Sequence, residues 1–184
     1  MLPFTLSICG LDELSGFLSP DVTHVISILD PDYPAPDGLA KISSEDRIIF
    51  HFDDATVPGA GRIHPASSDI EKLVDWSRSL SDSRVKHLLV HCHAGISRST
   101  AAAAIILAEK NPGREAEIFE EIDRIRPRNW PNSMMISLAD QLLACGGALN
   151  AALRSHHARI AARDPDLAEI IRRHGRAHEI PDDF

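Results

Sequence analysis

VKHLLVHCHAGISRST, residues 85–100, is the stretch of this sequence that decides the fold. Its first six residues form an apolar run typical of a buried strand, and residues 99–110 (STAAAAIILAEK) have the composition of a buried helix. A short turn around Gly95 joins the two segments. In open α/β sheets, ligands bind at the carboxyl ends of the strands, where a strand leads into a helix. The stretch therefore predicts an α/β fold with a ligand site at this turn.

Three more segments in the first half have the composition of strands. They are residues 3–9 (PFTLSIC), 23–29 (THVISIL) and 47–52 (RIIFHF). Residues 30–38 (DPDYPAPDG) carry three prolines and a glycine, which predicts a loop. Residues 53–65 (DDATVPGAGRIHP) predict a longer loop, and long loops in compact domains are often functional.

The remaining periodic segments predict helices. They cover residues 67–80, 99–110, 115–125, 133–145, 148–162 and 166–174. Strands that alternate with helices, followed by a helical second half, are typical of a short, mostly parallel central sheet flanked by helices. We expect residues 1–184 to form a single domain, with a core at about 5–147 and a helical C-terminal extension at 148–184.

The composition restricts the possible functions. The chain has 184 residues, of which 43% are hydrophobic and 25% charged, as in ordinary globular proteins. The formal net charge of −8 argues against nucleic acid or an anionic membrane as a partner. Three scattered cysteines do not form a disulfide framework, so we expect a reducing, cytoplasmic setting. No apolar run approaches the ~20 residues of a membrane span, and no basic segment precedes the apolar start as in a signal peptide.

The turn at residues 92–98 has the chemistry of an anion receptor. Backbone N–H groups between a strand and a helix have no ladder partners, and the helix dipole favours negative charge at its start. Gly95 supplies the backbone freedom that a tight turn needs. The guanidinium of Arg98 can hold two oxygens of a phosphoryl group. A thiol beside such groups, here that of Cys92, is drawn toward its reactive thiolate form.

Residues 91–99 (HCHAGISRS) resemble the signature His-Cys-x2-Gly-x2-Arg-Ser/Thr of the cysteine-dependent protein tyrosine phosphatases. The matched fixed positions are His91, Cys92, Gly95, Arg98 and Ser99. The segment AGISRS at 94–99 is most similar to the dual-specificity branch, and the short chain to its compact bacterial members. The resemblance covers residues 5–143 and implies the phosphotyrosine protein phosphatase-like fold. It has no counterpart for residues 148–184.

The resemblance implies a role for each residue of the signature. Cys92 would attack phosphorus and form a phosphocysteine intermediate, and Ser99 would hydrogen-bond the thiolate when it leaves. His91 would hold the shape of the loop through hydrogen bonds without reacting itself. The resemblance implies neither a metal nor another cofactor. The phosphate-binding residues would be His93, Ala94, Gly95, Ile96, Ser97 and Arg98.

The same family uses an aspartic acid on a loop upstream of the cysteine as the general acid. Asp53 and Asp54 open the loop that follows the third predicted strand. Matching the apolar positions of that strand to the family pattern places Asp54 at the acid position, and a slip of one residue would select Asp53. The neighbouring carboxylate would help to keep one of the pair protonated.

Downstream, residues 126–132 (RPRNWPN) resemble the arginine-then-Pro-Asn turn of the family, in which Asn132 is interpreted as structural. Arg126 and Arg128 either steer an anionic substrate or lie in a solvated turn. The histidines at 156–157, and those at 174 and 178, are interpreted as exposed helix surface. Arg172 and Arg173 are interpreted as a charged helix face, and Cys9 and Cys145 as small buried apolar side chains.

The resemblance implies a phosphatase acting on phosphotyrosine, phosphoserine or phosphothreonine in proteins. The larger, tyrosine-specific members of the family build a deep pocket with an aromatic clamp. Because this chain is shorter and Tyr33 is its only tyrosine, a shallow pocket is expected. Alternative substrates are non-protein phosphoesters, such as an inositol phosphate, a nucleotide or an RNA 5′-phosphate. A phosphate-binding pseudophosphatase, a sulfur transferase and an arsenate reductase are further alternatives. A metal site at His91–His93 is disfavoured because no second ligand pair has zinc spacing.

Overall fold

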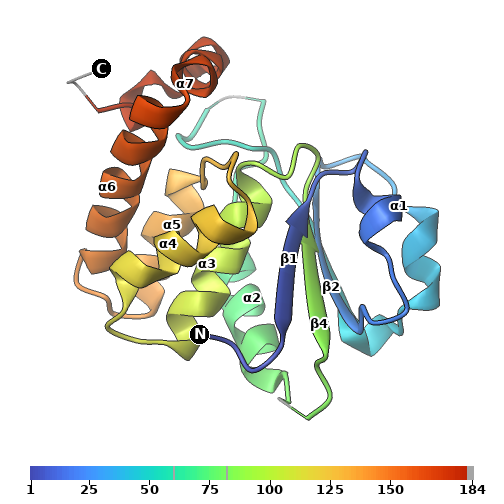
Figure 1. Ribbon diagram of the computed structural model, residues 1–184. Coiled ribbons are helices and arrows are strands. Elements are labelled where there is room, and N and C mark those ends of the chain that lie inside the picture. Colours follow the sequence, from blue (N-terminus) through green and yellow to red (C-terminus); the bar gives the residue numbers. More distant parts are fainter. Residues whose placement is uncertain (60, 82, 182–184) are drawn as a thin grey trace.

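The computed structural model describes residues 1–59, 61–81 and 83–181. Its centre is a sheet of four parallel strands in the order β1-β4-β2-β3 (Figure 1). The strands are β1 (Thr5–Cys9), β2 (His24–Leu29), β3 (Arg47–His51) and β4 (His87–His91). Each strand overlaps its predicted segment, and the parallel pairing confirms the predicted sheet. Because β4 lies between β1 and β2, the turn that follows it leaves from the middle of the sheet edge.

Helices cover both faces of the sheet (Figure 1). Helices α2, α3, α4 and α5 lie on one side, and α1 lies on the other with the short helical turns at Asp37–Lys41 and Ser44–Asp46. No helix in the described ranges is long and apolar enough to cross a membrane. The helices are α1 (Leu14–Phe17), α2 (Ser67–Ser79), α3 (Arg98–Lys110), α4 (Glu115–Ile125), α5 (Ser133–Leu142), α6 (Ala148–Arg163) and α7 (Pro165–Ile171).

The two faces of the sheet pack into separate cores. In β2, Ile26 and Ile28 belong to the large core shared with the helices, whereas Val25 belongs to a smaller core with Leu14 and Leu39. Burial on both faces is typical of parallel strands and accounts for their nearly continuous apolar composition. Helix α3 lies against β1, β2 and β4, and its alanines at 101–104 are fully buried. Their small side chains let the start of α3 lie close to the end of β4.

Some boundaries differ from the predictions for identifiable reasons. Helix α1 was not predicted, because four residues are too few to show a helical period. Helix α5 ends at Leu142 instead of residue 145, since Ala144 and the next two glycines take positive φ angles. Helix α7 ends at Ile171, and the predicted end at residue 174 falls in a wider turn that Gly175 closes at φ 78°.

The expectation of exposed histidines at 156 and 157 is wrong, because helix α6 turns both side chains toward the segment 126–132. His156 lies with Nε2 2.6 Å from the side-chain oxygen of Asn129, and Nε2 of His157 donates to the carbonyl of Pro131 at 3.1 Å. The His157 ring stacks on Trp130 with 4.2 Å between ring centroids. The C-terminal extension is therefore held by buried polar contacts as well as by apolar packing.

These contacts predict that stability falls in mild acid. Burial lowers the pKa of His156 and that of His157 to about 3, whereas an unfolded histidine titrates near 6.5. Below about pH 6.5 the unfolded chain therefore binds protons that the folded chain does not. The free energy of unfolding falls as the pH is lowered, by at most about 2 kcal/mol for each histidine at pH 5.

Denaturant unfolding between pH 7 and pH 5 measures this effect. The double variant His156→Gln/His157→Asn is expected to show a flatter dependence of unfolding free energy on pH than the parent chain. His178→Gln, at an exposed position, is the control and is expected to leave the slope unchanged. The same pH dependence of the unfolding free energy in the parent chain and the double variant would contradict this role of His156 and His157.

Candidate active site

The structure brings the sequence-predicted residues to one cavity of about 360 Å³. The loop between β4 and α3 forms its base with Cys92 and Arg98, and Asp53 and Asp54 line it from the loop that follows β3. His93, Ala94, Ile96 and Ser97 also line the cavity. The cavity therefore combines a thiol, a guanidinium and two carboxyl groups that come from separate parts of the chain.

Cys92 lies at the end of β4, where α3 begins. Its side chain is almost fully buried, and Sγ lies 3.2 Å from Oγ of Ser99 in the first turn of α3. A hydroxyl at this distance can donate to a thiolate. Cys9 is also buried, and burial raises the pKa of its thiol to about 12, with a smaller contribution from the Glu13 carboxylate. Cys9 therefore stays a neutral apolar side chain, whereas Cys145 is only half-buried.

The phosphate loop, residues 92–98, is held from outside through its carbonyl groups. Arg126 donates from Nε to the carbonyl of Gly95 at 3.1 Å and from Nη2 to that of Ala94 at 3.3 Å. Glu13 accepts a hydrogen bond from Arg126 at 2.8 Å, and that bond holds the pKa of the Glu13 carboxyl below its usual value. Arg126 is therefore partly buried and held by the loop carbonyls and Glu13, and does not lie in a fully solvated turn. Arg128, in contrast, is exposed and pairs with Asp164.

The same segment holds the next two carbonyl groups of the loop. The backbone N–H of Trp130 donates to Ile96 at 2.8 Å, and that of Asn132 donates to Ser97 at 3.3 Å. Within the described ranges, no hydrogen bond is donated by the backbone N–H groups of residues 94–98. The carbonyl groups of the loop thus have hydrogen-bond donors within the protein, whereas its backbone N–H groups remain free. This is the arrangement that binding of an anion requires.

Gly95 is required by a close approach of two backbones. Its φ is +69°, and a Cβ at this position would lie 2.5 Å from the carbonyl carbon of Cys9 and 2.6 Å from the nitrogen of Gly10. The end of β1 therefore leaves no room for a side chain at this point of the loop. Because the clash involves backbone atoms, the loop itself would have to move.

Arg98 presents a free edge of its guanidinium. The side chain is buried, and Nη1 donates to the carboxylate of Asp30 at 2.8 Å and to the carbonyl of Phe52 at 2.7 Å. Nε has no hydrogen-bond partner in the part of the chain that the structure describes. One corner of the guanidinium is therefore fixed by the protein, and the buried Nε remains for a ligand oxygen.

Two histidines flank Cys92 in the sequence. His91 is fully buried, and Nε2 lies 2.7 Å from the hydroxyl of Ser27 on β2. Burial lowers the pKa of His91 to about 4, so the ring is neutral near pH 7. Nε2 of His93 accepts the backbone N–H of Asp30 at 3.2 Å, and the ring lies edge-on to Tyr33. Both rings connect the loop to β2 and to the loop that follows it.

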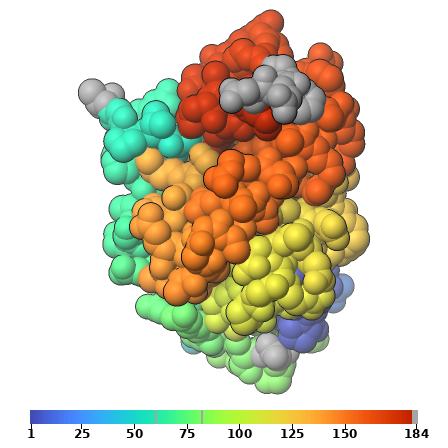
Figure 2. All heavy atoms as spheres, turned by 90° about the vertical axis from the view of Figure 1, so that its left-hand side faces the viewer, coloured from blue at the N-terminus to red at the C-terminus, as the bar shows by residue number. Residues whose placement is uncertain are grey.

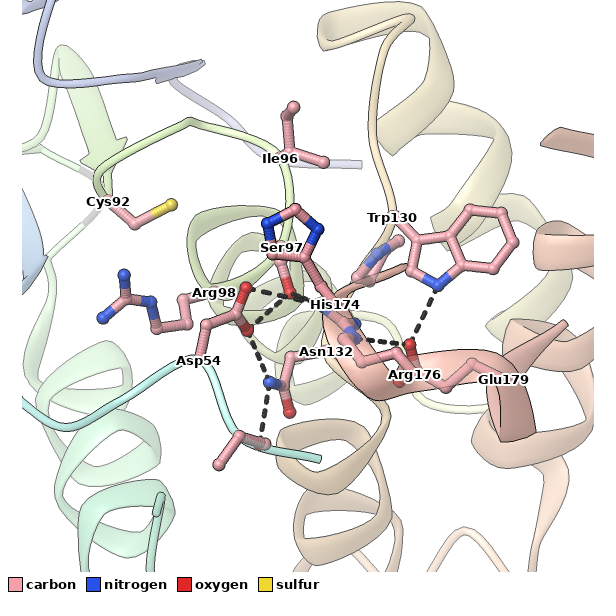
Figure 3. Close-up of polar contacts among 12 residues, drawn as sticks. Asp54, Cys92, Ile96, Ser97, Arg98, Trp130, Asn132, His174, Arg176 and Glu179 are labelled. Carbon is pink, nitrogen blue, oxygen red and sulfur yellow. Dashed lines mark hydrogen bonds and ion pairs between the residues drawn. The ribbon is translucent and has the colours of Figure 1, made fainter. Parts of the chain in front are cut away.

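The two acid candidates have different surroundings, and Figure 3 shows those of Asp54. Oδ1 of Asp54 accepts from the Ser97 hydroxyl at 2.7 Å and from the Asn132 amide at 2.8 Å, so the Asp54 carboxyl lies directly beside the phosphate loop. Asp53 instead accepts the backbone N–H of Ile63 at 2.7 Å and ties together its own loop. This geometry favours Asp54 over Asp53.

The C-terminal extension forms one wall of the cavity, whereas the sequence left open whether it completes the core or covers the pocket. The red C-terminal segment lies beside the cyan loop that follows β3 in both whole-chain views (Figures 1 and 2). Its side chains at the cavity are Leu167, Ile170, Ile171, His174 and Arg176. The expectation of a shallow pocket was made without the side chains that the C-terminal extension adds to the cavity. Asp30 was also missed, because its role depends on the position of β2 beside β4.

The cavity has no set of metal ligands. Among residues 1–59, 61–81 and 83–181, no three His, Cys, Asp or Glu side chains lie close enough together to hold a metal ion.

Gly95→Ala is expected to remove most of the affinity for inorganic tungstate or phosphate, as isothermal titration calorimetry can measure. The control is Gly113→Ala, because Gly113 has φ +81° and a Cβ added there would meet no atom within 4 Å. That variant carries only the strain of a positive φ, about 1–2 kcal/mol. Equal oxyanion affinity in the two variants would contradict the steric argument.

Solved structures provide the comparison with known proteins. No family model matches the sequence, and no curated protein matches it. The PTP-2 phosphatase of Cydia pomonella has a TM-score of 0.59 at 23% identity, covering 74% of this chain and 84% of its own. The structure of DUSP15 has a TM-score of 0.55 at 18% identity, and the match covers 84% of this chain and 91% of DUSP15. The structure of PTPMT1 in complex with PI(5)P has a TM-score of 0.55 at 16% identity, and the match covers 76% of this chain and 90% of PTPMT1. The chain therefore has the fold of the dual-specificity and protein tyrosine phosphatases.

Proposed function

We propose that this chain is a phosphatase that hydrolyses phosphomonoesters through a phosphocysteine intermediate on Cys92. One observation carries the proposal: the Cys92 sulfur lies at the base of a loop whose backbone N–H groups and Arg98 Nε are free to receive an oxyanion. The Ser99 hydroxyl, 3.2 Å from that sulfur, is placed to donate a hydrogen bond to it. The shared fold supports the same conclusion.

In the first step, the Cys92 sulfur attacks phosphorus, and the bond between phosphorus and the ester oxygen breaks. The loop N–H groups and Arg98 hold the three non-bridging oxygens, on which charge is spread in the transition state. The leaving oxygen needs a proton, which Asp54 supplies.

In the second step, water attacks the phosphocysteine, and the bond between phosphorus and sulfur breaks. Asp54, now ionised, takes the proton from the attacking water, as the reverse of its role in the first step requires. Ser99 donates to the thiolate that leaves. The products are inorganic phosphate and the free Cys92 thiolate, which fits a reducing compartment such as the cytoplasm.

The substrates that we propose are phosphotyrosine, phosphoserine and phosphothreonine in proteins. A structure with the same fold, that of PTPMT1, contains PI(5)P, so a non-protein phosphoester is the second candidate. A panel of phosphopeptides, inositol phosphates, nucleotides and 5′-phosphorylated RNA, ranked by kcat/KM, distinguishes the two. Higher kcat/KM for any small phosphoester than for every phosphopeptide would favour the second candidate.

Cys92→Ser is expected to lower turnover of 4-nitrophenyl phosphate by at least about a thousandfold, because the nucleophile is lost. Tungstate binding is expected to remain, since the loop N–H groups and Arg98 are unchanged. Cys145→Ser, at a half-buried position away from the cavity, is the control. Turnover within tenfold of the parent in Cys92→Ser would exclude Cys92 as the nucleophile, and binding without turnover by the parent chain would indicate a pseudophosphatase.

Asp54→Asn is expected to lower kcat for phenyl phosphate by about 10²–10⁴-fold, the usual contribution of a general acid. The alkaline limb of its pH–rate profile is expected to become flat, because the group that must be protonated is gone. Asp53→Asn serves as the matched comparison one residue earlier. If Asp53→Asn loses the alkaline limb and Asp54→Asn keeps it, the general acid is Asp53.

A further inference from the structure

Arg176 is a buried cation at the cavity that comes from the C-terminal extension. It lies in the turn after α7, and its side chain is 6% exposed. Nη1 donates to the Ser97 hydroxyl at 2.8 Å and to Oδ2 of Asp54 at 3.2 Å (Figure 3). Arg176 therefore contacts both the phosphate loop and the carboxyl group that we propose as the general acid.

A second carboxylate fixes Arg176 and balances its charge. Nε of Arg176 donates to Glu179 at 2.7 Å, and Glu179 also accepts from Trp130 Nε1 at 2.9 Å and from the backbone N–H of Ser133 at 3.1 Å. Since the charges of Arg176 and Glu179 cancel, the pair adds little net charge to the cavity. The guanidinium can therefore orient Asp54 without acting as a strong, unbalanced cation beside it.

The chain is shaped so that this one arginine of the turn points inward. Gly175, immediately before it, has φ +78°, which reverses the chain after α7. Arg172 and Arg173, four and three residues earlier, are exposed and pair with Glu169 on α7. The expectation of a charged helix face is confirmed for these two residues, and Arg176 differs from them by its burial and by its contacts.

The contacts of Asp54 are divided between its two oxygens. Oδ1 accepts from Ser97 and Asn132, so two donors occupy it. Oδ2 accepts only from Arg176 among the described residues, which leaves it room to carry a proton. Without Arg176, the carboxyl group would be held at Oδ1 alone and could rotate about its bond to Cβ.

We propose that Arg176 is a positioning residue that orients the carboxyl group of Asp54 for proton transfer to the leaving oxygen. Through Arg176, the C-terminal extension helps to hold the proposed general acid Asp54, whereas the phosphate loop alone supplies the groups proposed to bind the phosphate. This inference rests on the proposed phosphatase function. The inference predicts that replacing Arg176 lowers kcat most for substrates whose leaving group needs a proton.

Two substrates separate acid positioning from general damage. Phenyl phosphate has a basic leaving group that needs the acid, and 2,4-dinitrophenyl phosphate has one that leaves without a proton. For Arg176→Met, kcat for phenyl phosphate is expected to fall about 10–100-fold, since misplacing a catalytic group by about 1 Å can cost 10²-fold. For 2,4-dinitrophenyl phosphate, a change below about threefold is expected, because general acid catalysis is not used.

The matched control is Arg173→Met, the same replacement at an exposed position three residues earlier, and both rates are expected to stay at the parent level. Arg176→Lys keeps the charge but has only one donor group, so an intermediate loss for phenyl phosphate is expected. Thermal unfolding and tungstate affinity report whether each variant is folded with an intact loop. If Arg176→Met does not fold, Arg176→Lys alone decides between a selective and a uniform loss.

The outcomes separate this inference from the proposed function. Equal losses for both substrates, or no loss for either, in folded variants would overturn the role of Arg176 while leaving the phosphatase activity in place. Absence of turnover by the parent chain on 2,4-dinitrophenyl phosphate would overturn the proposed function itself.

Discussion

The site depends on the one-sided hydrogen bonding of the phosphate loop. Side-chain and backbone donors of residues 126–132 satisfy the carbonyl groups of residues 94–97, whereas the backbone N–H groups of residues 94–98 donate no hydrogen bond to any described residue. Gly95 makes this possible because it lets the loop lie against the end of β1. If the loop N–H groups instead found partners within the protein, they would not be available to bind an oxyanion.

The segment 126–132 also joins the phosphate loop to the C-terminal extension. Asn129 and Pro131 contact the two buried histidines of α6, and Trp130 donates to Glu179. The same seven residues thus shape the loop on one side and receive α6 and the final turn on the other. A change in how the C-terminal extension packs would therefore alter the position of Asp54, through the contact between Arg176 and Asp54.

The sequence predicted the parts of the fold that depend on local pattern. The four strands and the helix after Cys92 followed from the local composition of their segments, and the signature at 91–99 located the cavity. The contributions of Asp30, Arg126 and Arg176 could not be predicted, because each depends on which distant segment lies beside the loop. The histidines of α6 were misassigned for the same reason: polar side chains become buried when a distant segment supplies partners, and the local sequence carries no sign of that segment.

The most direct test of this account is to trap the covalent intermediate. Asp54→Asn protein mixed with 2,4-dinitrophenyl phosphate should form phosphocysteine normally, since this leaving group needs no acid, and should hydrolyse it slowly, since the base is missing. After an acid quench, mass spectrometry should find a phosphoryl group on the peptide that contains Cys92. Release of dinitrophenol without a phosphoryl group on that peptide, or with one on another residue, would contradict the account.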